Sequence, residues 1–203
     1  SRWPKDLGFG ANWLFNCEIV RASSKNPEGP YTFQEVVLGL RGRTFFDGMN
    51  VHNPYIRKWN QTYYLYYMGT TFGGPIPGPG DEVDSSRFTE VWNRKRIGLA
   101  TAPSVFGPWT RCDEPLISPR DCSHWDCTAT TNPAVAIQPD GTTYMLYKSR
   151  SFADGPLQIG VAKAPRRMVR LNGFWTTRFL ISRTRISIWK IRTCGTRTEN
   201  SAC

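Results

Sequence analysis

Three polar side chains of the sequence lie where they can do chemistry: His52 and Asn53 in one segment, and Asn132 in another. Both asparagines are followed by proline, and Asp126 comes shortly before Asn132. A carboxylate can act as a general acid or base, and amide and imidazole groups can form hydrogen bonds with hydroxyl groups of a ligand. The alternative for Asp126 is a turn-capping role, and for His52 and Asn53 it is a turn at the start of a strand.

Three further side chains lie close to these segments. Trp125 offers a flat apolar face to a ligand, although a Trp between strands is more often part of the core. Lys148 and Arg150 can reach the same place, and a solvated strand end is the alternative. The candidate catalytic residues are thus Asp126 and Asn132, and the candidate binding residues are His52, Asn53, Trp125, Lys148 and Arg150.

These residues belong to an internal repeat. The stretch from Val51, V-H-N-P-Y-I-R-K-W-N-Q-T-Y-Y-L-Y-Y, matches the stretch from Thr131, T-N-P-A-V-A-I-Q-P-D-G-T-T-Y-M-L-Y-K. Each copy has Asn-Pro, a short apolar run, a polar turn and a second run that contains tyrosine. Because proline moves the preceding residue out of the helical region and suits the first position of a strand, each copy is predicted to be an antiparallel hairpin.

A second module follows each hairpin. The sequence I-G-L-A-T-A-P at 97–103 matches I-G-V-A-K-A-P at 159–165, and residues 18–24 are a looser relative. Gly-Pro and an aromatic residue then follow at 107–109 and at 29–31. Four strands per unit, repeated every several tens of residues, are typical of propeller blades. The sequence therefore predicts an all-β propeller.

On these repeated motifs the chain resembles the five-bladed β-propeller glycoside hydrolases related to family 43, over roughly residues 12–165. The resemblance implies that His52-Asn53-Pro54 begins the second blade and Asn132-Pro133 the third, after the outer strands of the first blade at 12–40. We therefore expect a partial glycosidase domain at 1–165, with about two and a half of the five blades.

The resemblance also implies hydrolysis of arabinose-, xylose- or galactose-containing glycans, so that an oligosaccharide or polysaccharide is the partner. Such hydrolysis uses two carboxylates across the scissile bond. In the family an Asp base comes from the first blade, a second Asp orients the substrate, and a Glu acts as the acid. The second Asp maps onto Asn132, which is not acidic, and Asp126 in the adjoining loop can supply a carboxylate instead.

Two other functions stay open. A non-catalytic carbohydrate-binding propeller would keep the aromatic pocket and lose the acids. A glycoside phosphorylase of the same architecture would need a basic cluster for phosphate, for which Lys148 and Arg150 are few. Since the acids are not found at the expected places, we expect no hydrolysis of aryl arabinosides or xylosides by the chain as written.

Residues 166–203 depart from the repeat. They hold nine Arg and Lys residues and one acidic residue, which leaves 17 basic and 15 acidic residues in 1–165. A basic stripe usually favours nucleic acid or an acidic membrane surface as a partner. Because the excess charge lies in this one segment, we expect neither nucleic acid nor a membrane as a partner, and no apolar run approaches membrane-spanning length.

The genetic code offers an interpretation of this segment. Trp189 and Lys190 are encoded TGG-AAR, so the frame that starts at the last base of the Trp codon contains a forced glutamate codon, GAA. The same frame permits L-E-D-P-Y-V-W-Y-E-N-G-K-F-R-M over 188–203, which is another blade-opening hairpin. We interpret residues 166–203 as an out-of-frame translation without a domain of its own, and the family's acid maps onto that glutamate.

No cofactor and no metal site is expected. Cys122, His124 and Cys127 are crowded into one short loop with no second pair of ligands opposite. Free thiols are preferred over a bridge for the cysteines before residue 166. The compartment stays open, with a secreted or periplasmic parent enzyme preferred.

Overall fold

The computed structural model describes residues 1–3, 12–164, 169–171, 174–176 and 180–186. Beyond residue 164 only the backbone of three strands is described. The elements in chain order are α1 (Asn12–Phe15), β1 (Ile19–Ser23), β2 (Thr32–Leu38), β3 (Asn50–Trp59), β4 (Thr62–Thr70), α2 (Ser85–Asn93), β5 (Arg96–Ala102), β6 (Thr110–Arg111), β7 (Thr131–Ile137), β8 (Thr143–Ser149), β9 (Gln158–Ala164), β10 (Val169–Leu171), β11 (Phe174–Thr176) and β12 (Leu180–Ile186).

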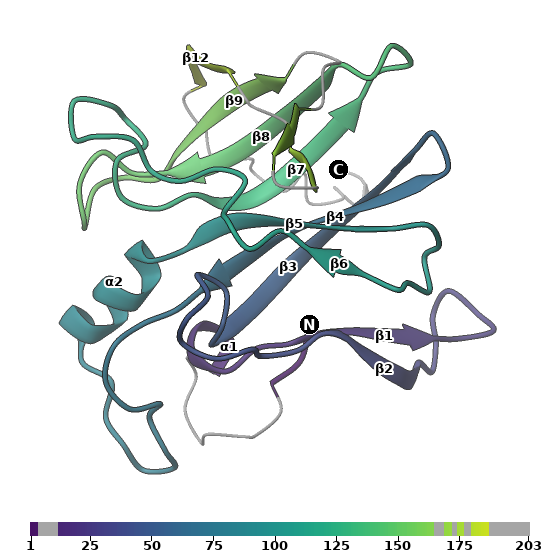
Figure 1. Ribbon diagram of the computed structural model, residues 1–203. Helices are drawn as coiled ribbons and strands as arrows, with labels where there is room; N and C mark the ends of the chain where they lie inside the picture. The colour runs from purple at the N-terminus through teal and green to yellow at the C-terminus, as the bar shows by residue number, and fades with distance from the viewer. Residues whose placement is uncertain (4–11, 165–168, 172–173, 177–179, 187–203) are drawn as a thin grey trace, which may run out of the picture.

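The strands form antiparallel sheets that follow the repeat of the sequence. One four-stranded sheet has the order β3-β4-β5-β6, and the other has the order β7-β8-β9-β12. Strands β1 and β2 form a separate pair, and so do β10 and β11. Figure 1 shows β1-β2 below, the β3 sheet in the middle and the β7 sheet above. The prediction of a partial all-β propeller is confirmed, with two helices added.

Each predicted hairpin is present and begins its sheet. Strand β3 pairs with β4, and β7 pairs with β8, so the two Asn-Pro strands are the first strands of their blades. They also contact each other across the interface between the blades. The sequence predicted that each proline occupies the first position of its strand. In the structure both prolines lie inside the strands, where the register shifts. A bulge explains this position, because proline has no N–H to donate to the ladder.

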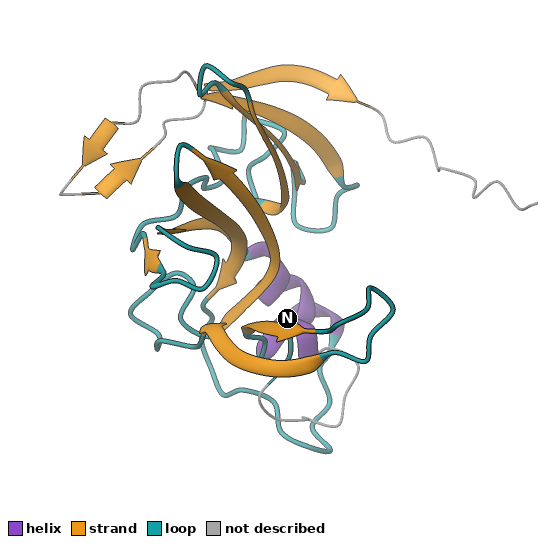
Figure 2. Cartoon of the chain, turned by 90° about the vertical axis from the view of Figure 1, so that its right-hand side faces the viewer, coloured by secondary structure: helices purple, strands orange, loops and turns teal. Residues whose placement is uncertain are grey.

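A long insertion that contains α2 lies between β4 and β5. Its Gly- and Pro-rich part has no regular structure, but α2 follows directly after it. Asp84 caps α2, because its side chain accepts a hydrogen bond from the backbone N–H of Arg87 at 2.8 Å. Val91 and Trp92 are buried in a cluster with Leu14 and Phe15 of α1 and with Phe72, which follows β4. Figure 2 shows the two helices beside each other at one end of the strands.

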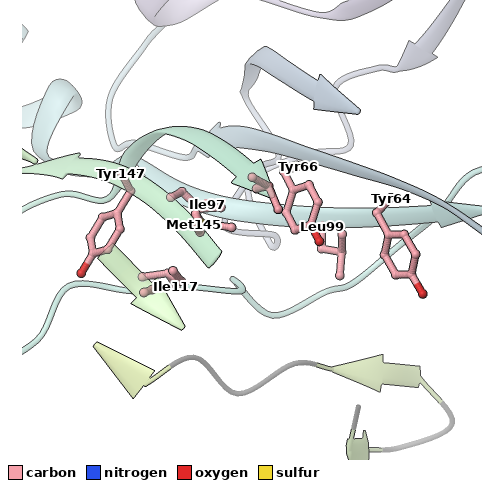
Figure 3. Close-up of a cluster of buried hydrophobic side chains, with 9 residues drawn as sticks. Tyr64, Tyr66, Ile97, Leu99, Ile117, Met145 and Tyr147 are labelled. Atoms are coloured by element: carbon pink, nitrogen blue, oxygen red, sulfur yellow. The ribbon is translucent and has the colours of Figure 1, made fainter. Parts of the chain in front are cut away.

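The largest core cluster lies between the two four-stranded sheets. It joins Tyr66, Ile97 and Leu99 of the β3 sheet to Met145 and Tyr147 of the β7 sheet, as Figure 3 shows. Alternate residues of β8 are buried, which is the period of two that a strand covered on one face has. Packing of one blade against the next therefore buries the tyrosine-rich strands and fixes β3 beside β7.

Part of the basic segment at 166–203 is described. Strand β12 pairs with β9 and completes the second four-stranded sheet, with Leu180 opposite Lys163 and Ile186 opposite Ile159. Residues 187–203, which include Trp189 and the predicted frame-shifted hairpin, lie outside the described residues. The out-of-frame interpretation therefore stays a prediction about the coding sequence.

Candidate functional site

Asn53 and Asn132 occupy equivalent places on β3 and β7. Both are exposed, and both have a left-handed backbone, with φ of 49° and 53°. The side-chain amide of Asn53 and the backbone N–H of Asn132 each donate to the Sδ of Met68, at 3.7 Å and 2.9 Å. Met68 is buried, so the contact holds the two strands together beneath the two exposed amides. The prediction that the asparagines are equivalent is confirmed.

A β-bulge produces this conformation in each blade. In the blade that begins with β3, His52 pairs with Met68 and Tyr55 with Tyr66, so two residues of β3 lie opposite Tyr67 alone. In the blade that begins with β7, Thr131 pairs with Lys148 and Ala134 with Leu146, so two residues of β7 lie opposite Tyr147. A bulge bends its strand and turns a side chain in a new direction, and it is frequent next to functional sites.

A buried carboxylate supports the first bulge. Asp47 is fully buried, and its Oδ2 accepts a hydrogen bond of 2.7 Å from the hydroxyl of Tyr67. Arg41 lies 2.7 Å from the other carboxylate oxygen, and Arg111 lies 3.3 Å from Oδ2. Burial and the neighbouring Asp47 carboxylate raise the pKa of Tyr67, so this tyrosine is neutral and donates its proton.

Asp126 supports the second bulge in the same way. It is fully buried, its Oδ2 accepts a 2.7 Å hydrogen bond from the hydroxyl of Tyr147, and its Oδ1 lies 2.7 Å from Nε of Arg120. Both carboxylate oxygens are thus occupied, and neither is presented to a ligand. This geometry favours a structural role for Asp126, in place of the catalytic role that we weighed for it.

The glycine of the Ile-Gly-x-Ala module completes each unit. Gly98 pairs with Tyr67, and Gly160 pairs with Tyr147. A Cβ on Gly98 would lie 2.5 Å from Cζ of Tyr67, and a Cβ on Gly160 would lie 2.0 Å from Cζ2 of Trp125. The third strand therefore needs glycine where an aromatic ring crosses it.

Trp125 is part of the core and does not face a ligand. Its ring packs on Tyr147 with a centroid distance of 5.3 Å, and it covers Gly160. It also belongs to the partly buried residues around the core between the sheets. The structure thus favours the core alternative for Trp125.

His52 is buried beside Asn53. Its ring lies 5.8 Å from that of Trp13 in α1, and its Nε2 has no hydrogen-bond partner among the described residues. Burial, together with the charge of Lys95, lowers the pKa of His52 to about 3. A neutral imidazole can donate or accept a hydrogen bond but carries no charge at neutral pH.

A group of cations and indole rings lies beside His52. Nζ of Lys95 lies 4.4 Å from the ring centroid of Trp13 and 4.7 Å from that of Trp92. The guanidinium of Arg150 lies 3.9 Å from the same Trp92 ring. Such cation–π contacts contribute about 0.5–2 kcal/mol each. Of these four residues, only Arg150 was a sequence candidate.

Lys95 is the most unusual of the group, because only 2% of its surface is exposed. Burial, together with the charges of Arg150 and Lys148, lowers the pKa of Lys95 to about 7. The backbone oxygen of Lys95 accepts a hydrogen bond of 3.0 Å from the N–H of Thr130, which fixes Lys95 close to Asn132. Lys148 pairs with Thr131 in the ladder and is half-buried. The site thus combines two exposed amides, one neutral imidazole and three basic side chains.

Comparison with solved structures relates the chain to carbohydrate-active enzymes. Zg3597, a family 117 glycoside hydrolase from Zobellia galactanivorans, matches 82% of this chain at 21% identity with a TM-score of 0.59. The chain has the fold of the propeller glycoside hydrolases. An endo-1,4-β-xylanase from Bacteroides thetaiotaomicron matches 70% of this chain at 18% identity with a TM-score of 0.47. The match covers 42% of the xylanase. A thermostable family-43 glycoside hydrolase matches 79% of this chain at 17% identity with a TM-score of 0.35, and the chain covers 66% of that protein.

The match is confined to part of these enzymes. The chain spans 41% of the length of Zg3597. No protein-family model matches the sequence, and no curated protein matches it. The resemblance to five-bladed propeller glycoside hydrolases is confirmed at the level of the fold.

Three further properties concern the part of the chain that the structure describes. Neither of its helices is long and apolar enough to cross a membrane. In the same residues, no group of three or more His, Cys, Asp and Glu side chains is arranged to hold a metal ion. Cys17, Cys112, Cys122 and Cys127 are free thiols.

Proposed function

We propose that this chain forms part of the sugar-binding end of a propeller glycoside hydrolase. The observation that carries the proposal is the pair of equivalent bulges on β3 and β7, which present Asn53 and Asn132 side by side above Met68. Amide groups donate and accept hydrogen bonds, which is what recognition of sugar hydroxyls requires. The fold shared with Zg3597 supports the same assignment.

The proposed substrates are glycans that contain arabinose, xylose or galactose. In this proposal Asn53 and Asn132 bind sugar hydroxyls, and the neutral His52 contributes a further hydrogen bond. Lys148 and Arg150 line the same end from the blade that begins with β7. In this proposal Asp47 and Asp126 are not the catalytic carboxylates, because both are fully buried in ion pairs.

A non-catalytic carbohydrate-binding function is the second candidate, and the buried state of both carboxylates favours it for the chain as written. Two measurements on the full 203-residue chain separate the two functions. Isothermal titration with arabino-, xylo- and galacto-oligosaccharides measures binding, and release of nitrophenol from aryl arabinosides and xylosides measures hydrolysis.

We expect binding of at least one of the three oligosaccharide series and no measurable hydrolysis. Loss of a carboxyl general acid costs on the order of 10²–10⁴-fold in rate. Absence of binding to all three series would contradict the proposed function. Hydrolysis that is lost in Asp126→Asn, with stability unchanged, would assign the acid to Asp126 and contradict its structural role.

A further inference from the structure

The buried ammonium group of Lys95 has no carboxylate partner in the part of the chain that the structure describes. The ion pairs of that part use other basic residues, such as Arg41 with Asp47 and Arg120 with Asp126. The two indole rings at 4.4 Å and 4.7 Å are the contacts that surround Nζ. Aromatic rings offset only part of the cost of removing an ammonium group from water. Lys95 is therefore poorly compensated in the chain without a ligand.

Arg150 brings a second uncompensated cation to the same ring. Its Nη1 donates to the backbone oxygen of Ala153 at 2.9 Å, but its Nε is buried and has no partner among the described residues. Guanidinium groups bind planar and tetrahedral oxyanions through two parallel N–H donors. A bound oxyanion would accept a hydrogen bond from this unpaired Nε and would balance the charge of the neighbouring buried ammonium group.

Lys148 and His52 add further donors at the same place. Lys148 lies near enough for its charge to act on Lys95. His52 has an unpaired Nε2, is 3% exposed, and packs on the same Trp13 ring as Lys95. Because like charges repel, two or three cations at one place cost stability unless an anion binds there.

We propose that Lys95 and Arg150, assisted by the charge of Lys148, bind an oxyanion beside Asn53 and Asn132. The anion is either the carboxylate or sulfate group of an acidic sugar or free inorganic phosphate. All three present negatively charged oxygen atoms to the same donors. The placement beside a sugar rests on the proposed function above, but anion binding itself does not. The three basic side chains therefore select an acidic glycan, or a phosphate ion that binds together with a neutral glycan.

The first test uses sulfate, whose charge is constant over the working pH range. Thermal unfolding of the full chain is followed against sulfate concentration at constant ionic strength, with chloride as the balancing anion. We expect a saturable rise in Tm for the wild type, because a ligand that binds only the folded state stabilises it. Lys95→Met and Arg150→Gln should each weaken the apparent affinity by about tenfold or more, which corresponds to the loss of one charged hydrogen bond.

A matched control removes the same charge from the same region. Arg94 lies next to Lys95 in sequence, is exposed, and pairs with Glu90 at 3.0 Å. Arg94→Gln should leave the sulfate response unchanged. Equal losses in Arg94→Gln and Lys95→Met, or no saturable response beyond that of chloride in the wild type, would overturn the proposal.

Two safeguards keep the test decisive. Lys95→Met should fold and be more stable than the wild type without ligand, because it removes a buried charge and keeps the length of the side chain. If Arg150→Gln does not fold, Lys148→Gln replaces it, with a smaller expected loss of affinity. Lower stability of Lys95→Met, together with an unchanged sulfate response, would show that Lys95 is structural and would overturn the proposal.

Binding of four ligands, namely methyl galacturonide, methyl galactoside, sulfate and inorganic phosphate, identifies the source of the anion. Tighter binding of methyl galacturonide than of methyl galactoside and of sulfate would place the anion on the sugar. Inorganic phosphate that binds with the same affinity with and without methyl galactoside would identify a free ion. Sulfate binding that is retained while no neutral oligosaccharide binds would contradict the proposed function and leave the anion site in place.

Discussion

The side-chain amide of Asn53 and the backbone N–H of Asn132 both donate to the Sδ of Met68, although the two asparagines belong to different blades. Each blade builds its bulge from the same parts: a buried Asp, a Tyr whose hydroxyl binds it, and a glycine opposite that Tyr. The bulges meet where β3 contacts β7. The repeated unit therefore places exposed amides side by side where β3 contacts β7.

The buried carboxylates are expected to hold the blades rather than to carry out catalysis. Asp47→Asn and Asp126→Asn should each lower the free energy of unfolding by up to about 3–5 kcal/mol, because each removes a fully buried carboxylate that pairs with a half-buried arginine. Asp113→Asn is the control, since Asp113 also pairs with Arg41, at 2.6 Å, but is 66% exposed. Asp113→Asn should lower the free energy of unfolding by less than about 1 kcal/mol. Urea unfolding followed by circular dichroism measures all three, and equal effects would contradict this account.

The glycines opposite the tyrosines should not tolerate a methyl group. Gly98→Ala and Gly160→Ala should destabilise the chain by about 1–3 kcal/mol, because the new Cβ would lie 2.5 Å and 2.0 Å from an aromatic ring. Gly73→Ala in the insertion, where a Cβ meets no atom within 4 Å, should change stability by less than about 0.5 kcal/mol. The midpoint of thermal unfolding orders the three variants. A Gly98→Ala protein as stable as Gly73→Ala would show that the aromatic rings do not occupy these positions.

Lys95 should make stability depend on pH in alkaline solution. Its pKa is about 7 in the folded chain and 10.5 as the ordinary value, so between these limits the unfolded chain binds more protons than the folded one. Stability therefore rises with pH in this window, by up to about 1.4 kcal/mol per pH unit from this group. Other groups titrate here as well, so the test is the difference between wild type and Lys95→Met in urea unfolding at pH 7 to 10. That difference should shrink as the pH rises, and parallel curves would rule out a buried neutral lysine.

The basic segment at 166–203 gives a prediction about the gene. We expect the bases that the protein sequence leaves free in the codons of residues 188–203 to be those that permit L-E-D-P-Y-V-W-Y-E-N-G-K-F-R-M in the shifted frame. The nucleotide sequence from the codon of Ala162 onward checks this directly. Bases that place stop codons or unrelated residues in that frame would favour an evolved basic segment.

The elements were predictable from the sequence because each depends on local patterns. Asn-Pro, a polar turn and an alternating tyrosine-rich run define a hairpin whatever lies around it, and both hairpins are present. The repeat also extends further back than its obvious part, since Arg41 and Asp47 precede Asn53 with the same spacing as Arg120 and Asp126 precede Asn132. That spacing was the available signal that Asp126 has a structural counterpart.

The role of Lys95 could not be predicted in this way. It lies in the run Asn93-Arg94-Lys95-Arg96, which has the composition of a solvated surface. Its burial depends on Trp13 and Trp92, which the chain brings to it from α1 and α2. Trp125 is a second example, because its place against Tyr147 and Gly160 follows from the close approach of three separate segments of the chain. Side-chain surroundings of this kind arise from tertiary packing and leave no local pattern.

The central claim is that Asn53 and Asn132 present their amides to a sugar, and one comparison by isothermal titration tests it most directly. Asn53→Gly and Asn132→Gly remove the amide and keep the left-handed backbone, which glycine adopts readily. Asn60→Gly is the matched control, because Asn60 is exposed and left-handed as well, with φ of 44°, in the turn at the opposite end of β3. We predict that the affinity for the oligosaccharide that binds the wild type falls about tenfold in the first two variants and is unchanged in Asn60→Gly. Unchanged affinity in both Asn53→Gly and Asn132→Gly would contradict the account.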